Sequence, residues 1–321
     1  MKSLFITNAG PNIGGGHLSR CFALSSALSL LGVDSRWILN DAARTQAEAL
    51  GVSNAYYLPD PFSDGYLPSK ESADFVVVDS YIPGADFFMR LSERMPLAVI
   101  DDLHENGAER FADILINYGI GANRNLYGDG DCKFLLGPRY ALLREEYWRL
   151  CPKDGDYVLF TAGASDVRNC SADMSRWWSG DMTRLIIVLG PFVAEEARLR
   201  VLREISEKHN VEILAAPDNF ASLQAHAGFV ISSASVTAYE ALSLEKKLAV
   251  FTVAENQRGF GEILSGIGAA YNLGDWRGVN MESIREALKL SPDVDTLKGL
   301  VNKCGACACA EAVVKILGGS R

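Results

Sequence analysis

The chain has 321 residues, of which 48% are apolar and 22% charged, a balance that excludes a disordered, collagen-like or fibrous protein. Its 31 Lys and Arg residues stand against 40 Asp and Glu residues, and the net charge of −9 excludes a general basic surface for nucleic acid. Apolar runs are far shorter than the roughly 20 residues that span a bilayer, and the start of the chain does not resemble a signal peptide. We therefore expect a cytoplasmic protein of about two domains, without membrane insertion.

In the first half of the sequence, short runs rich in Val, Ile, Leu and Phe alternate with segments of helical length. The predicted strands are residues 4–7, 35–39, 55–58, 75–79, 97–101, 114–117 and 133–136. A helix is predicted at residues 17–31, where Gly32 is a typical C-terminal stop. Strands that alternate with helices form parallel sheets, so the pattern predicts an α/β domain with one sheet of six or seven strands.

A charged segment and the turn-forming run 151–156 separate this series from a second one. The second series has predicted strands at residues 157–161, 185–189, 211–215, 229–232 and 248–252, and one long helix or two at 294–317. The sequence thus predicts two α/β domains, residues 1–150 and residues 151–321. Ligands of such sheets bind at the carboxyl ends of the strands, so two facing sheets would form a ligand-binding cleft.

A glycine-rich loop follows the first predicted strand and places Gly14, Gly15 and Gly16 directly before His17. Glycines let the backbone turn tightly and approach a ligand closely. In the first turn of a helix the dipole disfavours an imidazolium, so the ring of His17 could take a proton from water. The alternative is a structural turn with a capping histidine, and the third glycine of the dinucleotide fingerprint is absent because Ser19 stands there.

Acidic residues end two further predicted strands of the first domain. Asp79 is followed two residues later by Tyr81, and Asp101-Asp102 ends the next strand. Carboxylates at this edge of a sheet can orient a histidine or a sugar hydroxyl, whereas the alternative is that they cap the helices that follow. Asn117-Tyr118 ends a third strand and has the same two interpretations.

Small or polar residues follow three predicted strands of the second domain. They are Gly163 and Ser165 in the first loop, Ser235, Val236, Thr237 and Glu240 in the second, and Asn256 and Gln257 in the third. Backbone amides in such a loop and at a helix N-terminus can bind a diphosphate, despite the adverse net charge of the chain. A carboxylate such as Glu240 suits a ribose diol, and side-chain amides can bind a base. Taken singly, each loop also has an ordinary structural explanation as a helix cap.

The seven cysteines of the chain are predicted to be free thiols. Cys304, Cys307 and Cys309 are close in sequence, but no second Cys or His pair follows at the spacing of a zinc site. Their Ala-rich surroundings favour the packing of a helix, since a buried free cysteine behaves as a small apolar residue. We therefore expect no metal.

Several motifs, taken in their order along the chain, resemble the PseG family. They are the loop before His17, the strand end at Asp79, the segment 137–147, the Gly163 loop and the residues around Glu240 and Gln257. These are the UDP-sugar hydrolases of bacterial pseudaminic acid biosynthesis. The resemblance covers residues 1 to about 275. It implies a GT-B-like fold of two Rossmann-like domains that face each other across a cleft, with UDP held mainly by the second domain and a last helix that returns to the first.

The resemblance also implies a reaction and the residues that perform it. A metal-independent enzyme without a cofactor would release UDP from a UDP-linked 2,4-diacetamido-2,4,6-trideoxy sugar by inverting attack of water at the anomeric carbon. His17 matches the motif histidine as the general base, Asp79 and Tyr81 match the strand-end pair, and Gly14, Gly15 and Gly16 match the sugar and phosphate loop. The residues that would bind UDP are Gly163, Ser165, Ser235, Val236, Thr237, Glu240, Asn256 and Gln257. The expected partners are the UDP-sugar and UDP, without nucleic acid.

Two positions depart from the family pattern and leave the exact sugar open. Ala164 stands where glycine is common, and Ser80 stands where many members carry histidine. The main alternative function is a glycosyltransferase of the same fold that uses a UDP-sugar donor. A non-catalytic nucleotide-sugar-binding protein is another alternative, and a hydrolysing epimerase is less favoured because no second base is evident. The sequence does not indicate an oligomeric state.

Overall fold

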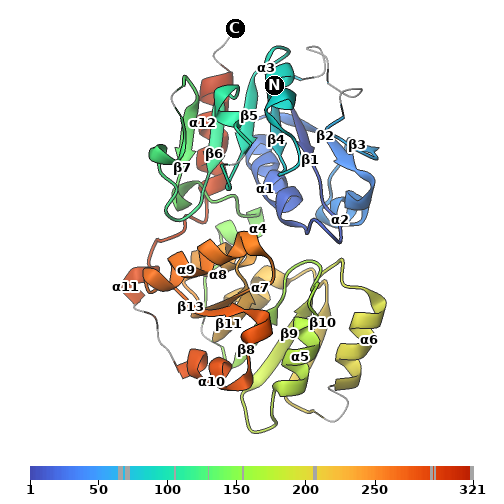
Figure 1. Ribbon diagram of the computed structural model, residues 1–321, viewed down its shortest axis with the longest axis vertical. Helices are drawn as coiled ribbons and strands as arrows, with labels where there is room; N and C mark the ends of the chain where they lie inside the picture. Colours follow the sequence, from blue (N-terminus) through green and yellow to red (C-terminus); the bar gives the residue numbers. More distant parts are fainter. Residues whose placement is uncertain are drawn as a thin grey trace. The chain divides into compact units, whose positions relative to one another are not determined.

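The computed structural model divides the chain into two compact units (Figure 1). The first unit contains Met1–Trp148 and the segment that begins at Asn302, and the second contains Arg149–Val301. The sequence-based boundary assigned residues 151–321 to the second domain, but the resemblance also implied that the last helix returns to the first domain, to which the segment from Asn302 on belongs. The structure describes residues 1–63, 68, 73–104, 106–128, 130–153, 155–204, 208–289, 292 and 294–318.

The first unit is built on a parallel sheet of seven strands. These strands are β1 (Lys2–Thr7), β2 (Asp34–Asn40), β3 (Ala55–Leu58), β4 (Phe75–Asp79), β5 (Leu97–Ile100), β6 (Ile114–Asn117) and β7 (Lys133–Leu136). The helical elements of the unit include α1 (Gly16–Leu30), α2 (Arg44–Leu50), α3 (Ala85–Ser92), the 3₁₀ turn η5 (Pro138–Tyr140), α4 (Glu145–Trp148) and α12 (Gly305–Leu317). The strand order β3-β2-β1-β4-β5-β6-β7 places the topological switch point between β1 and β4.

The apolar runs of this half of the chain form strands because both faces of the sheet are covered. All five residues of β4 are buried, and Val76, Val78 and Phe88 belong to one core cluster. Helix α1 buries Leu18 and Leu24 against the sheet, and it ends before Gly32, whose φ of +75° few other residues adopt. The prediction of a parallel α/β sheet is therefore confirmed.

Helix α12 belongs to the first unit because it packs against α1 and η5 (Figure 1, where α12 is red). Its buried face contains Ala306, Cys309, Ala310 and Val313, and the Sγ atom of Cys309 lies 3.5 Å from the carbonyl oxygen of Tyr140. The thiol is therefore part of an apolar helix contact. A separate short helix, α11 (Val294–Leu297), precedes α12, so the stretch 294–317 forms two helices.

The second unit repeats the design with a parallel sheet of six strands. These strands are β8 (Tyr157–Thr161), β9 (Arg184–Leu189), β10 (Val211–Ala215), β11 (Phe229–Ser233), β12 (Leu248–Thr252) and β13 (Tyr271–Asp275). The helices are α5 (Cys170–Trp177), α6 (Glu195–Glu204), α7 (Phe220–Ala225), α8 (Val236–Ser243), α9 (Arg258–Gly266), α10 (Met281–Lys289) and α11. In the order β10-β9-β8-β11-β12-β13 the switch point lies between β8 and β11.

Strand β13 is the one strand of the second sheet that the sequence pattern did not predict. It lies at the edge of the sheet, all five of its residues are only half buried, and its pairing with β12 shifts register between Val250 and Phe251. An edge strand with these features needs no continuous apolar run. No helix within the described ranges combines the length and apolar character needed to cross a membrane.

Candidate active site

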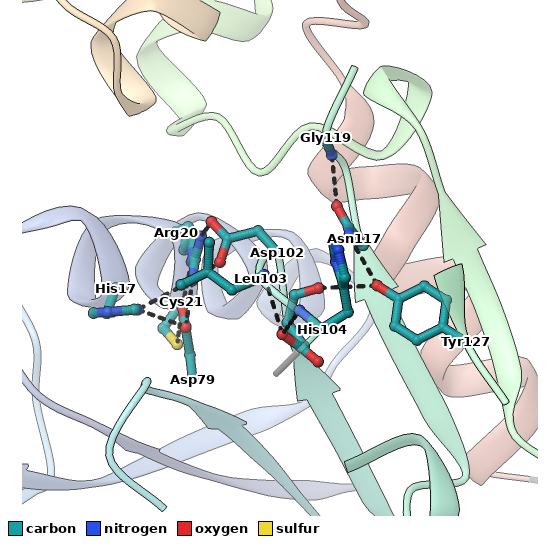
Figure 2. A network of polar contacts seen from close by, with 11 residues as sticks. His17, Arg20, Cys21, Asp79, Asp102, Leu103, His104, Asn117, Gly119 and Tyr127 are labelled. Carbon is teal, nitrogen blue, oxygen red and sulfur yellow. Dashed lines mark hydrogen bonds and ion pairs between the residues drawn. The ribbon is translucent and has the colours of Figure 1, made fainter. Parts of the chain in front are cut away.

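His17 and Asp79 meet at the switch point of the first sheet. His17 lies in the first turn of α1, which follows β1, and Asp79 is the last residue of β4, the strand that pairs with β1. The His17 Nδ1 atom lies 2.7 Å from Asp79 Oδ1, and the two side chains are only 6% and 0% exposed (Figure 2). The topology thus places an imidazole and a carboxylate where ligands of open α/β sheets bind.

The glycine-rich loop fixes the start of α1 and thereby the position of His17. Gly10 and Gly14 form two backbone hydrogen bonds with each other, at 2.7 and 3.1 Å, and Gly14 has a φ of +86°. Gln46 on α2 donates from its side-chain nitrogen to the carbonyl oxygen of Gly15 at 2.9 Å, and a Cβ at Gly15 would lie within 3.0 Å of that side chain. The loop is therefore closed on itself and packed against α2.

Arg20 completes the pair, although the sequence analysis did not select it. Its Nε donates to Asp79 Oδ2 at 2.6 Å and its Nη2 donates to Asp79 Oδ1 at 2.7 Å, so the guanidinium binds both carboxylate oxygens. Nη2 also lies 3.0 Å from the Nδ1 atom of His17. The available signal was the spacing, because residues three apart on a helix share a face and Arg20 follows His17 by three.

The two acidic residues after β5 have different roles. Asp102 accepts a hydrogen bond from Nη1 of Arg20 at 2.6 Å, so the arginine connects the ends of β4 and β5. Asp101 instead accepts the backbone N–H groups of Leu103 and His104, at 3.2 and 2.8 Å. Asp101 therefore caps a turn instead of the helix that the alternative interpretation expected, whereas Asp102 joins the polar cluster.

Two tyrosines lie beside this cluster. The ring of Tyr81 meets the ring of His17 edge-on at a centroid distance of 4.4 Å, and 44% of Tyr81 is exposed. Tyr118 is buried, with the guanidinium carbon of Arg20 6.0 Å from its ring centre. The Oγ atom of Ser80 accepts the backbone N–H of Ile82 at 3.1 Å, so this residue shapes the turn that carries Tyr81.

Opposite charges keep the carboxylates of Asp79 and Asp102 ionised. Burial alone raises the pKa of Asp79, but the charge of Arg20 and the contact with His17 outweigh it and lower the pKa to about 2. Burial also opposes ionisation of Asp102, and Arg20 again lowers its pKa below the ordinary value. Burial raises the pKa of Tyr118 to about 12. Near neutral pH the cluster therefore holds two carboxylates, one guanidinium and protonated tyrosines.

The shifted pKa of Asp79 predicts how the stability of the protein depends on pH. Because the folded-state pKa is below the ordinary 3.8, the contribution of Asp79 is present above pH 3.8 and is lost as the pH falls toward 2. The loss should be on the order of 2 kcal/mol. Urea unfolding at several pH values measures it. Asp79→Asn should lack this part of the slope, and identical slopes for both proteins would contradict the assignment.

The hydrogen bond to Asp79 determines what the imidazole can do. A carboxylate only accepts hydrogen bonds, so His17 must donate from Nδ1, and we assign this tautomer from that contact. The Nε2 atom then carries a lone pair. After it takes a proton, the carboxylate beside Nδ1 stabilises the imidazolium. The arrangement can therefore act as a general base.

In the second unit, two of the predicted loops meet at the switch point. Strands β8 and β11 are paired, with Thr161 opposite Ser232, so the loops that follow them are neighbours. A Cβ at Gly163 would lie 3.3 Å from the Oγ atom of Ser233, which in turn lies 3.2 Å from the Oγ atom of Ser235. The predicted residues Gly163 and Ser235 are therefore brought together.

The N-terminus of α8 lies at this point and has the character of an anion site. Ser235 is the N-cap, its side chain makes no capping hydrogen bond, and Val236 and Thr237 in the first turn are half buried. First-turn amides have no partner within their own helix and attract anions. Glu240 follows Thr237 by three residues and is buried.

The remaining predicted nucleotide residues occupy the flanking loops. The Oγ atom of Ser165 is buried without a hydrogen-bond partner among the described residues, while its neighbour Asp166 caps α5. The 3₁₀ turn η6 (Glu255–Gln257) follows β12; there Asn256 is exposed, and the side-chain oxygen of Gln257 accepts the backbone N–H of Val253 at 2.9 Å. Gln257 therefore fixes its own turn, and its amide nitrogen is the part of the side chain that a ligand could use.

A substitution at Gly190 tests how tightly the Gly163 loop is constrained. A Cβ at position 190 would overlap the carbonyl oxygen of Gly163 and the backbone of Ala164. Gly190→Ala should therefore displace the loop, lower the free energy of unfolding by about 1–3 kcal/mol and weaken the UDP binding that the sequence analysis expects of this loop. Thermal unfolding and calorimetry measure both effects. Gly180→Ala is the matched control, because a Cβ there meets no atom within 4 Å; equal behaviour of the two variants would refute the close approach.

Within the described part of the chain, no group of three or more His, Cys, Asp or Glu side chains is placed to hold a metal ion. The polar cluster of the first unit consists instead of two carboxylates joined by one guanidinium. Within this cluster, the imidazole of His17 and the carboxylate of Asp79 form a pair that can transfer a proton.

Comparisons by sequence give distant relatives. No family model matches the chain. An uncharacterized protein of Methanocaldococcus jannaschii is 24% identical over 276 residues, and the match spans 80% of this chain but only 57% of that protein. The UDP-2,4-diacetamido-2,4,6-trideoxy-beta-L-altropyranose hydrolase of Campylobacter jejuni is 24% identical over 270 residues, 80% of this chain and 93% of its own.

Comparisons by structure define the fold. The glycosyltransferase SnogD from Streptomyces nogalater superposes with a TM-score of 0.64 at 16% identity, covering 98% of this chain and 99% of its own. The UDP-GlcNAc 2-epimerase from Neisseria meningitidis, bound to UDP-GlcNAc, gives a TM-score of 0.59 at 12% identity and covers 99% of both chains. The protein therefore has the two-domain α/β architecture of GT-B glycosyltransferases, which different activities share.

Proposed function

We propose that the protein is a UDP-sugar hydrolase in which His17 activates water. The observation that carries the proposal is the buried contact of 2.7 Å between His17 Nδ1 and Asp79 at the switch point, which leaves Nε2 as a proton acceptor. The distant similarity to the hydrolase of Campylobacter jejuni supports the same reaction, and that relative is matched over nearly its whole length.

In this mechanism water is the nucleophile. The Nε2 atom of His17 takes one proton from water while the oxygen attacks the anomeric carbon from the face opposite UDP. The bond between that carbon and the phosphate oxygen breaks, and UDP leaves with the bonding electrons. Asp79 stabilises the imidazolium that forms. A base of this kind contributes about 10²–10⁴ in rate, and UDP is already a good leaving group. Tyr81 packs on the His17 ring and orients water or sugar.

The second unit binds UDP in this proposal. The amides at the N-terminus of α8 and the small-residue loop at Gly163 offer donors to the diphosphate, and such donors stabilise the charge that develops on the leaving phosphate. Glu240 binds the ribose, and Asn256 and the amide nitrogen of Gln257 bind the base or the ribose. Ser165 supplies a hydroxyl next to the phosphates. In the first unit, Gly14, Gly15 and Gly16 shape the sugar end.

We propose a UDP-linked 2,4-diacetamido-2,4,6-trideoxy sugar as the substrate, and pseudaminic acid biosynthesis as its context. The support is the sequence resemblance and the substrate named for the relative from Campylobacter jejuni. Ser80 and Ala164 are the two departures from the family pattern. Ser80 shapes the turn before Ile82, so we expect its effect on the sugar to act through the position of Tyr81.

A glycosyltransferase is the second candidate, and the structural similarity to SnogD favours it. Both activities use a nucleotide site and an anomeric carbon, and they differ in whether water or a hydroxyl compound attacks. Incubation of the protein with the UDP-sugar in the absence of any acceptor separates them. The hydrolase forms UDP and free sugar in equal amounts at every turnover. A protein that binds UDP but releases none from any UDP-diacetamido sugar would overturn the hydrolase proposal.

A further inference from the structure

The groups that contact the His17 ring, or its partners Asp79 and Arg20, come from α1 and from the ends of three strands. On α1 they are Arg20 and Cys21, whose buried thiol lies 3.7 Å from Asp79. The end of β4 supplies Asp79 and Tyr81. Burial raises the pKa values of the thiol and of the phenol, so both are uncharged.

The remaining neighbours follow β5 and β6. Asp102 follows β5 and is 29% exposed, and the buried Tyr118 follows β6 and stays protonated. Asp101 directs its contacts to the backbone of the turn at residues 103–104. The charged groups that bear on the ring are therefore Arg20, Asp79 and Asp102.

We infer that Arg20 and Asp102 are positioning residues that set the basicity of His17 in opposite directions. The inference rests on the proposed function for its effect on catalysis, but the charges act on the ring in the free protein as well. Arg20 holds both oxygens of Asp79 and thereby presents Oδ1 to the imidazole. Its Nη2 atom, 3.0 Å from Nδ1, also opposes a positive charge on the ring.

Asp102 offsets the unfavourable effect of the Arg20 charge on a protonated His17 ring. Its contact with Nη1 of Arg20 at 2.6 Å balances the guanidinium, so that Asp79 keeps its attraction for an imidazolium. With neutral His17 the three charges add to −1, and proton uptake by the ring brings the cluster to neutrality. Without Asp102 the cluster would begin neutral and become positive inside a buried site, which is unfavourable. The pair Arg20–Asp102 thus provides both the orientation and the charge that a base requires.

The test compares Asp102→Asn, Arg20→Gln and Arg20→Lys with the unaltered protein. In each, the ring of His17 is titrated by NMR on protein with ¹⁵N-labelled histidine, and the pH profile of UDP release is recorded. The chain has 4 histidines, and the signal missing from His17→Asn identifies the ring. The midpoint of the imidazole titration should fall by about one pH unit or more in D102N and rise by a similar amount in R20Q. R20K retains the charge and should shift far less than R20Q.

The acid limb of the activity profile should move in the same directions, because the base works only while unprotonated. Asp102→Asn preserves the shape of a partly exposed side chain, so it tests the inference even if Arg20→Gln does not fold. Shifts in the same direction for D102N and R20Q, or an unchanged midpoint in D102N, would overturn the inference. Opposed NMR shifts in a protein that never hydrolyses a UDP-sugar would support the charge effect and defeat the proposed function alone.

Discussion

His17→Ala is expected to lower the turnover of the UDP-sugar by at least about 10²–10⁴-fold while the affinity for UDP stays nearly the same. The variant loses the imidazole whose Nδ1 contacts Asp79 and whose Nε2 is the proposed proton acceptor. The residues proposed to bind UDP lie in the second unit, so the substitution leaves them intact. Steady-state release of UDP measures turnover, and titration calorimetry measures affinity.

His209→Ala is the matched control for this experiment. His209 is an exposed histidine of the second unit, so its loss should change neither turnover nor UDP binding. Turnover by the His17 variant at the rate of the control would remove the general base from the mechanism. A parallel loss of UDP affinity would show that the histidine acts in binding.

Asp79→Asn should reduce turnover by a comparable factor, for a different reason. Asp79 Oδ1 faces both Nη2 of Arg20 and Nδ1 of His17, and Oδ2 faces Nε of Arg20, so an amide turns its NH₂ group toward a donor of Arg20 in either orientation. The amide also carries no negative charge to stabilise the imidazolium that forms when His17 takes a proton. Arg20 also loses a buried charged partner, and the free energy of unfolding should fall by about 3 kcal/mol. Turnover, UDP affinity and urea unfolding measure these effects.

Asp131→Asn controls for the loss of one negative charge, because Asp131 is an exposed carboxylate of the same unit. It should leave both turnover and stability near their original values. The variant at position 79 should still bind UDP, since the proposed nucleotide residues lie elsewhere. Full activity in that variant would contradict the dyad, whatever its stability.

Much of the fold could be predicted because the central strands are buried on both faces. β4 and β12 have every residue buried, so their apolar runs stand out and their bounds agree with the predicted ranges. Strand order could not be predicted in this way, since pairing depends on contacts far apart in sequence. The switch points are therefore known only from the structure. They lie beside the central strands β1 and β8, which are the strands that precede His17 and Gly163.

The candidate site was predictable in part for the same reason. Asp79 could be selected because it ends a recognisable strand, and His17 because it follows the glycine-rich loop between the first strand and the first helix. Arg20 was missed because an arginine within an apolar helix gives no sign of its partners, which lie 59 and 82 residues away. Asp101 and Asp102 are adjacent acids with different contacts, and only the direction of each side chain distinguishes the residue that caps the turn from the ion-pair partner.

Hydrolysis in ¹⁸O-labelled water, with no acceptor present, tests the central claim most directly. Mass spectrometry of the products shows which bond was cleaved and which molecule attacked. The account predicts one ¹⁸O atom in the free sugar, at the anomeric hydroxyl, and none in UDP, with the reaction dependent on His17. Label in the phosphate of UDP, or no release of sugar until a second hydroxyl compound is added, would contradict it.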